Sequence, residues 1–93
     1  MNEEIKDAYK ELYAALVKLK SEEDCKIFLQ DLCTIKEVDS MAQRIVAAKM
    51  LLNGETYESI IKKTNISSAT LSRVSRCVKY SEGYKKILDE NYK

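Results

Sequence analysis

The segment that decides the fold runs from residue 56 to residue 79 and reads TYESIIKKTNISSATLSRVSRCVK. Apolar residues recur at helical spacing on both sides of a polar break at residues 64–67. Asn65, within the break, is one of the few residues other than glycine that tolerate a positive φ, and Ile66 is expected to fill the angle between two helices. The segment therefore predicts a helix-turn-helix, in which two short helices are joined by a tight turn.

The second helix of this pair, predicted over residues 68–79, has an apolar side and a basic side. At 100° per residue, Leu71, Val74 and Val78 share the side that is expected to dock on the rest of the protein. Small residues on the other side admit a close approach to base edges, and arginine can bind guanine through two hydrogen bonds. We therefore expect this helix to enter the major groove of double-stranded DNA. The residues expected to contact bases or phosphates are Ser67, Ser68, Ala69, Thr70, Ser72, Arg73, Arg76, Lys62, Lys63 and Lys79.

The rest of the chain predicts an all-α fold with about six helices. Apolar periodicity indicates helices over residues 3–19, 22–33 and 35–52, the helix-turn-helix, and a sixth helix near the carboxyl terminus. Ser21, Thr34, Thr56, Ser67 and Ser81 are the expected N-caps of the helices that follow them, and Asn53 with Gly54 is expected to end the third helix. In the fourth helix we expect Tyr57, Ile60 and Ile61 to face inward.

Charge is distributed unevenly along a chain whose net charge is only +1. Residues 1–43 hold ten acids and six bases, whereas residues 44–80 hold seven bases and two acids. A weakly acidic part joined to a basic part is typical of a dimerisation body that carries a nucleic-acid-binding head.

We therefore interpret residues 1–93 as a single domain. Residues 1–54 and 80–93 form its expected dimerisation body, and residues 55–79 form its DNA-reading head.

The composition disfavours several other classes of protein. The chain has no histidine, and its three cysteines form no CxxC pair, so neither a metal site nor a cofactor is expected. Because the chain has no histidine for acid–base chemistry and no glycine-rich phosphate loop, we do not expect an enzyme. Paired carboxylates such as Glu22 and Glu23 lie at expected helix starts, where the helix dipole explains them. The acidic start, MNEEIKD, is not a signal peptide, and no apolar run is long enough to cross a membrane. These features predict a cytoplasmic protein that does not bind membranes.

Two longer stretches carry a resemblance to a known family. DLCTIKEVDSMAQRIVAAKMLLNGETYESIIKKT, at residues 31–64, and SSATLSRVSRC, at residues 67–77, are similar to the Trp repressor-like superfamily, in particular its YerC/YecD group. The resemblance implies an intertwined homodimer that regulates transcription, and we expect a repressor. Two reading heads would then meet half-sites about one DNA turn, roughly 34–36 Å, apart.

The resemblance also implies a small-molecule pocket. Three positions match residues that contact tryptophan in the Trp repressor: Thr34, Arg44 and Arg73. Val74, however, stands where that repressor has a glycine beside the indole ring, and Cys77 stands where it has a serine. Because the branched side chain of Val74 should crowd the pocket, we do not expect tryptophan to bind.

Two alternatives to an effector-independent DNA-binding regulator remain open. One is an effector-gated regulator that uses the three matching residues, although helix capping would explain Thr34 by itself and Arg44 could pair with Glu37 or Asp39. The other is a helical interaction module that uses the hairpin around Ile60 and Leu71 to hold another protein and does not bind DNA.

Overall fold

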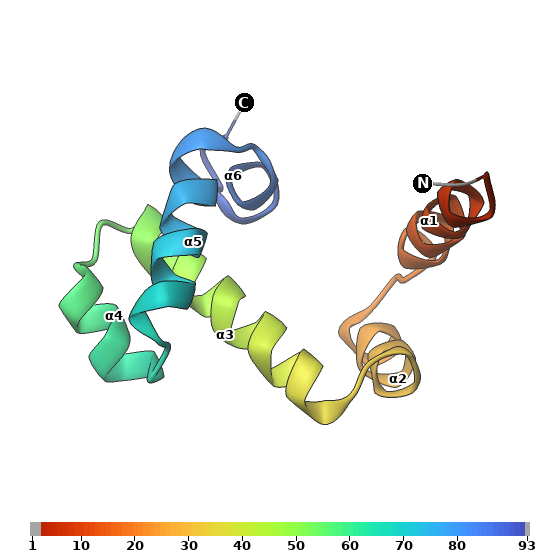
Figure 1. Cartoon of the computed structure of the whole chain (residues 1–93), viewed down its shortest axis with the longest axis horizontal. Coiled ribbons are helices and arrows are strands. Elements are labelled where there is room, and N and C mark those ends of the chain that lie inside the picture. Colours follow the sequence, from red (N-terminus) through yellow and green to blue (C-terminus); the bar gives the residue numbers. More distant parts are fainter. Residues whose placement is uncertain (1–2, 93) are drawn as a thin grey trace. The chain divides into compact units, whose positions relative to one another are not determined.

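A computed structural model describes the backbone of residues 3–92 and the side chains of residues 7–92. Within residues 3–92 the chain forms six α-helices and no strand, which confirms the predicted all-α class (Figure 1). The helices are α1 (Glu3–Leu16), α2 (Glu22–Leu32), α3 (Ile35–Leu52), α4 (Tyr57–Thr64), α5 (Ser68–Tyr80) and α6 (Gly83–Leu88). The chain divides into two compact units, one ending at Ile35 and one beginning at Lys36.

Three of the predicted helix caps are confirmed by their hydrogen bonds. The side chain of Ser21 accepts from the backbone N–H of Asp24 at 3.0 Å, and that of Thr56 accepts from Ser59 at 3.1 Å. Ser67 likewise accepts from the N–H of Thr70 at 3.1 Å. Each of these bonds satisfies a donor that the first turn of a helix leaves without a partner. Local side-chain chemistry therefore sets where α2, α4 and α5 begin.

The two turns around α4 use left-handed residues, as the sequence predicts. Gly54 has φ 83° after α3, and Asn65 has φ 60° after α4. The backbone N–H of Asn65 donates to the carbonyl of Ile61 at 2.8 Å, which closes the last turn of α4. Asn65 is the only non-glycine residue with positive φ in the described part of the chain. The chain can therefore reverse direction between α4 and α5 within three residues.

Two predicted helix boundaries are wrong. α1 ends at Leu16 and not at residue 19, because the N–H groups of Lys18 and Leu19 bond three residues back, at 3.1 and 3.2 Å, in a tightened final turn. The expected cap Ser81 belongs instead to the end of α5, where its N–H donates to the carbonyl of Cys77 at 2.9 Å. Apolar spacing continues through both regions, so periodicity alone does not reveal where the helices end.

The core of the second unit consists of two clusters that follow one another along the buried side of α5. The first joins Ala47 of α3 to Ile60 of α4, Ile66 of the turn and Leu71 of α5. The second joins Ala48 of α3 to Val74 and Val78 of α5, with Tyr84 and Leu88 of α6 packed against it. α5 therefore lies across α3 and connects the turn after α4 to the start of α6 (Figure 1). The predicted docking side of the second reading helix and the predicted filling role of Ile66 are both confirmed.

The first unit has no comparable core. None of the described side chains of α1 and α2 is buried, and large apolar side chains remain exposed on both helices. The exposed apolar residues of this unit are Tyr9, Leu12, Tyr13, Leu16, Val17, Ile27, Leu32 and Ile35. Helices of 14 and 11 residues are marginal in water when they pack against nothing. The stability of this unit therefore requires that something cover these side chains.

The left-handed position of Asn65 leads to a stability prediction. Asn65→Ala should lower the free energy of unfolding by about 1 kcal/mol, because alanine pays the steric cost of the left-handed region without the compensating amide. Asn65→Gly should leave stability close to that of the unaltered protein. The measurement is thermal unfolding followed by circular dichroism. Asn53→Ala is the matched control, since it makes the same chemical change at an exposed residue whose φ is not positive. Equal losses from Asn65→Ala and Asn53→Ala would contradict this account of the turn.

Candidate nucleic-acid interface

The helix predicted to read DNA exposes its polar side. Leu71 and Val74 are buried with exposures of 0% and 1%, whereas Ser72, Arg73 and Arg76 on the opposite side are exposed. α5 contains no aspartate or glutamate. Of the ten residues predicted to contact DNA, nine are exposed, and the tenth, Thr70, is half-buried. They extend from the second half of α4 through the turn and along α5.

The start of α5 combines a side-chain cap with exposed small residues. The hydroxyl of Ser67 donates to Oγ1 of Thr70 at 2.9 Å, in addition to accepting the N–H of that residue. The hydroxyls of Ser67 and Thr70 are therefore largely engaged with each other. Ser68 and Ala69 are exposed, and their N–H groups belong to the first turn of the helix, where backbone donors have no intrahelical partner. This end of α5 offers backbone donors and a partial positive charge to an anion.

A hydrogen bond from α3 fixes the position of α4. Nε2 of Gln43 donates to the carbonyl oxygen of Thr64 at 3.0 Å, at the last residue of α4. The Thr64 hydroxyl donates to the carbonyl of Ile60 at 2.7 Å and accepts the N–H of Ile66 at 3.2 Å. These bonds satisfy polar groups of the turn while the apolar side chain of Ile66 enters the core. The turn is thereby tied to α3 as well as to its own two helices.

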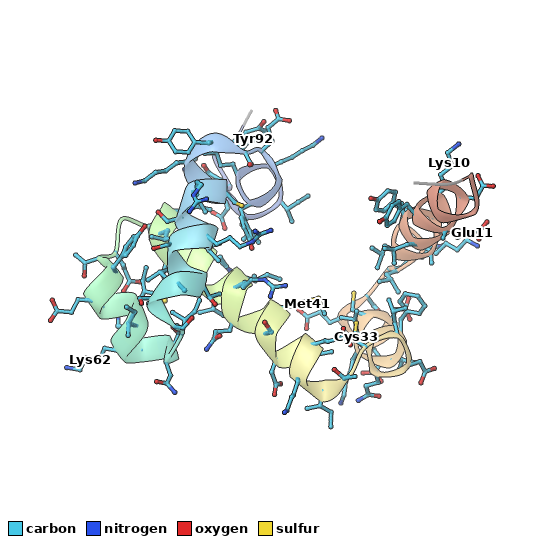
Figure 2. All side chains as sticks on the ribbon, viewed as in Figure 1. Lys10, Glu11, Cys33, Met41, Lys62 and Tyr92 are labelled. Atoms are coloured by element: carbon cyan, nitrogen blue, oxygen red, sulfur yellow. The ribbon has the colours of Figure 1, made fainter. Side chains whose placement is uncertain are left out.

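The two lysines of α4 differ in their surroundings. Lys62 lies at the outer side of the helix and points away from the rest of the second unit (Figure 2). Nζ of Lys63 instead lies 2.9 Å from Oε1 of Glu55. That hydrogen bond, assisted by the Ser59 hydroxyl, holds the pKa of the Glu55 carboxyl below its ordinary value. Because part of the Lys63 charge is already offset, Lys62 is the stronger candidate for attracting a phosphate.

Two of the three residues predicted for an effector pocket come together. Arg44 and Arg73 line a hollow of about 520 Å³. This volume lies within the roughly 300–1,000 Å³ that is typical of sites for small organic ligands. Nη1 of Arg44 donates to the hydroxyl of Ser40 at 2.8 Å. No carboxylate lines this hollow; its remaining residues are Ser40, Thr70, Val74, Cys77 and Tyr84. Thr34 belongs to the first unit, so its part in the pocket stays a prediction.

A second hollow, on the other flank of α5, was not predicted. It measures about 270 Å³ and is lined by Tyr57, Ser72, Ser75, Arg76, Lys79 and Tyr80. The expectation that Tyr57 faces inward is wrong, since its side chain is 41% exposed and contributes to this hollow. Ser75 is the only buried polar residue reported in the described part of the chain, with an exposure of 3%. In the sequence, Ser75 falls near Leu71 and Val78 on the apolar side of the predicted helix. A polar residue at such a position could have indicated that Ser75 is buried.

Other kinds of site find no support among the described residues. Within that part of the chain, no three cysteine, aspartate or glutamate side chains lie close enough together to hold a metal ion. None of the helices described is both long and apolar enough to span a membrane.

Comparison with known proteins identifies the family. A family model described as "Trp repressor protein" matches residues 7–92. The YerC protein of Bacillus subtilis strain 168, whose function is not characterised, is 45% identical over 80 residues, covering 85% of this chain and 77% of YerC. The crystal structure of a TrpR-like protein from Eubacterium eligens has a TM-score of 0.84 at 40% identity, covering 92% of this chain and 91% of that one. A candidate Trp repressor from Staphylococcus aureus has a TM-score of 0.85 at 40% identity, covering 89% and 84% of the two chains. The match over most of the chain confirms the resemblance found in the sequence, and the chain belongs to the Trp repressor family.

Proposed function

We propose that the protein is a sequence-specific regulator of transcription, a repressor, that binds double-stranded DNA in the cytoplasm with α5 in the major groove. The observation that carries this proposal is the two-sided character of α5. One side is fixed in the core by Leu71, Val74 and Val78, and the other exposes serine and arginine with no acid between them. The family is one of DNA-binding regulators and not of enzymes, which agrees with this surface.

The exposed groups suggest a division of roles. Arg73 has a guanidinium group that can bind a guanine through two hydrogen bonds, and Arg76 can bind either a base or a phosphate that borders the groove. Ser72 is small enough for the backbone to approach the bases. The start of α5 and Lys62 carry donors and charge that suit phosphates, which position a protein on the duplex without reading its sequence. Repression would follow from occupation of the operator.

We further propose that the functional form is a homodimer. The apolar side chains of α1 and α2 are exposed, and a core this small gains stability when a second copy covers such surfaces. The four that share one face of α1 are Tyr9, Leu12, Tyr13 and Leu16. Two copies would present two α5 helices, which suits an operator with two half-sites.

The DNA-binding proposal predicts the effect of removing both arginines from α5. Arg73→Ala/Arg76→Ala should weaken binding to an operator sequence obtained by in vitro selection by more than about tenfold, since a single base-reading arginine contributes about 1–3 kcal/mol and the second charge is lost as well. The far-ultraviolet circular dichroism spectrum should be unchanged, because both side chains are exposed. Binding is measured by fluorescence anisotropy at several salt concentrations.

Lys49→Ala/Lys86→Ala is the matched control for this experiment. It removes two positive charges from exposed positions outside α5 and should affect specific binding much less. An operator affinity that survives the double arginine change would contradict the proposal. If no duplex is retained even at low salt while a protein partner is captured, the interaction-module alternative is favoured.

The dimer proposal predicts that a charge on the apolar face of α1 will dissociate the protein. Leu12→Glu should shift the mass measured by analytical ultracentrifugation from two chains to one, because a carboxylate cannot be buried there without a partner. Ala14→Glu adds the same charge to the same helix, about 160° around its axis at 100° per residue, and should leave the dimer intact. A single-chain mass for the unaltered protein at micromolar concentration would contradict the proposal.

A second candidate function is control by a small anionic effector. The supporting observation is the hollow of ≈ 520 Å³ that places Arg44 and Arg73 together without a carboxylate. Two guanidinium groups suit a carboxylate or phosphate ligand. Val74, which is buried and also lines this hollow, leaves less space for an aromatic ring than a glycine would. The ligand class that fits is therefore a non-aromatic organic acid.

A screen by thermal shift and calorimetry tests this second function. Amino acids and related organic acids are added one at a time to the dimer. A true effector should raise the unfolding temperature of the unaltered protein, and Arg44→Gln should abolish that shift. Tryptophan should give no shift. A flat response to every acid in the screen would remove the effector-gated alternative.

A further inference from the structure

We propose that the unpredicted hollow between the start of α4 and the flank of α5 holds one phosphate group of the DNA backbone. This inference rests on the proposed DNA-binding function and assigns a role to Ser75, which the sequence analysis did not connect with DNA. The hollow is lined by Tyr57 of α4 and by Ser72, Ser75, Arg76, Lys79 and Tyr80 of α5.

The Ser75 hydroxyl is the first observation that points to a ligand. The residue is buried to all but 3% of its surface, yet no hydrogen bond from its side chain is found among the described residues. Every fully enclosed side-chain nitrogen or oxygen in that part of the chain does have a partner. Because Ser75 lines the hollow, its oxygen must reach the open space there. A hydroxyl that has no partner within the protein but faces this hollow can bind a ligand there.

The charge and size of the hollow indicate which ligand this is. Arg76 and Lys79 supply two positive charges, and no carboxylate lines the hollow. Its volume of about 270 Å³ falls below the roughly 300–1,000 Å³ typical of sites for drug-sized molecules. Hydroxyl donors beside two cations form the kind of surroundings that bind a phosphate through charge-assisted hydrogen bonds. Tyr57 and Tyr80 also line the hollow.

The position of the hollow on the helix indicates where that phosphate comes from. Ser72, Ser75, Arg76 and Lys79 follow the spacing i, i+3, i+4, i+7, so they form one stripe along a flank of α5. A helix with side chains is about 10–12 Å across, and the major groove is about 12 Å wide. The flanks of an inserted helix therefore lie against the phosphates that border the groove, while its outer side faces the bases. The stripe lies at such a border, with the start of α4 beside it.

The test compares Ser75→Ala and Lys79→Gln with the unaltered dimer on two probes, the selected operator and a mixed-sequence duplex. Ser75→Ala should weaken binding to both probes equally, by about tenfold, the size expected for one hydrogen bond to a charged group. Because the hydroxyl has no partner in the free protein, the same variant should unfold at an unchanged or higher temperature. Lys79→Gln should reduce the slope of log affinity against log salt by about 1.

Lys86→Gln, at an exposed position on α6, is the control for the lost charge and should leave the slope unchanged. Unaltered binding by Ser75→Ala and Lys79→Gln would overturn the phosphate site while leaving the DNA-binding function in place. Loss of operator binding alone would also overturn it, because a backbone contact does not discriminate between sequences. Failure of the unaltered protein to bind either duplex would instead overturn the proposed function and this site together.

A second arm separates the DNA backbone from a free phosphate ligand. Inorganic phosphate or ATP, added without DNA, should produce no shift in unfolding temperature that depends on Ser75. If such a shift occurs and Ser75→Ala leaves DNA affinity unchanged, the hollow belongs to a free ligand and the assignment to the backbone is wrong.

Discussion

The contact between α5 and two consecutive alanines of α3 is the constraint on which the second unit depends. Ala47 packs with Ile60, Ile66 and Leu71, and Ala48 packs with Val74 and Val78. The distance between packed helices depends on the side chains at the contact, and alanine permits a short one. A larger side chain at either position would have to displace α5, since the core has no space to accept it. The outward side of α5 is available for binding because its inward side is held so closely.

The side chains of α5 fall into four stripes that have different surroundings. Leu71, Val74 and Val78 hold the helix in the core, and the outermost side carries Ala69 and Arg73. The two flanks each line a hollow, one with Arg44 of α3 and one with Tyr57 of α4. A helix of 13 residues can present four such stripes because residues three and four apart share a face while their immediate neighbours do not.

Features governed by local chemistry could be predicted from the sequence. The caps at Ser21, Thr56 and Ser67 depend on one side chain and a donor three residues away, and the left-handed turn depends on the tolerance of Asn65 for positive φ. The buried side of α5 could be predicted from the helical spacing of its apolar residues. The end of α1 and the place of Ser81 could not be predicted in this way, because apolar spacing does not stop where the hydrogen bonding changes.

The candidate sites likewise include features that depend on local sequence, which could be predicted, and features that depend on helix packing, which could not. The exposure of the residues expected to contact DNA could be predicted from the apolar pattern within each of the two helices, without knowledge of how the helices pack. The hollow beside Ser75 could not be predicted, because it requires the angle between α4 and α5, which is set by the packing of Ile60 and Ile66 against Ala47. For the same reason the exposure of Tyr57 was missed, since an aromatic residue at helical spacing usually faces the core. Arg44 and Arg73 are far apart in sequence, and only the family resemblance suggested that they meet.

The bond from Gln43 to the end of α4 has a mechanical consequence. This bond and the alanine contacts attach α4 and α5 to α3 at two separate places, which restricts their rotation about α3. In a two-headed assembly, the separation of the heads would be set by the path of α3, a rigid rod about 27 Å long. Such a protein would be selective for half-site spacing: it would bind poorly to operators that have the right bases at the wrong distance from each other.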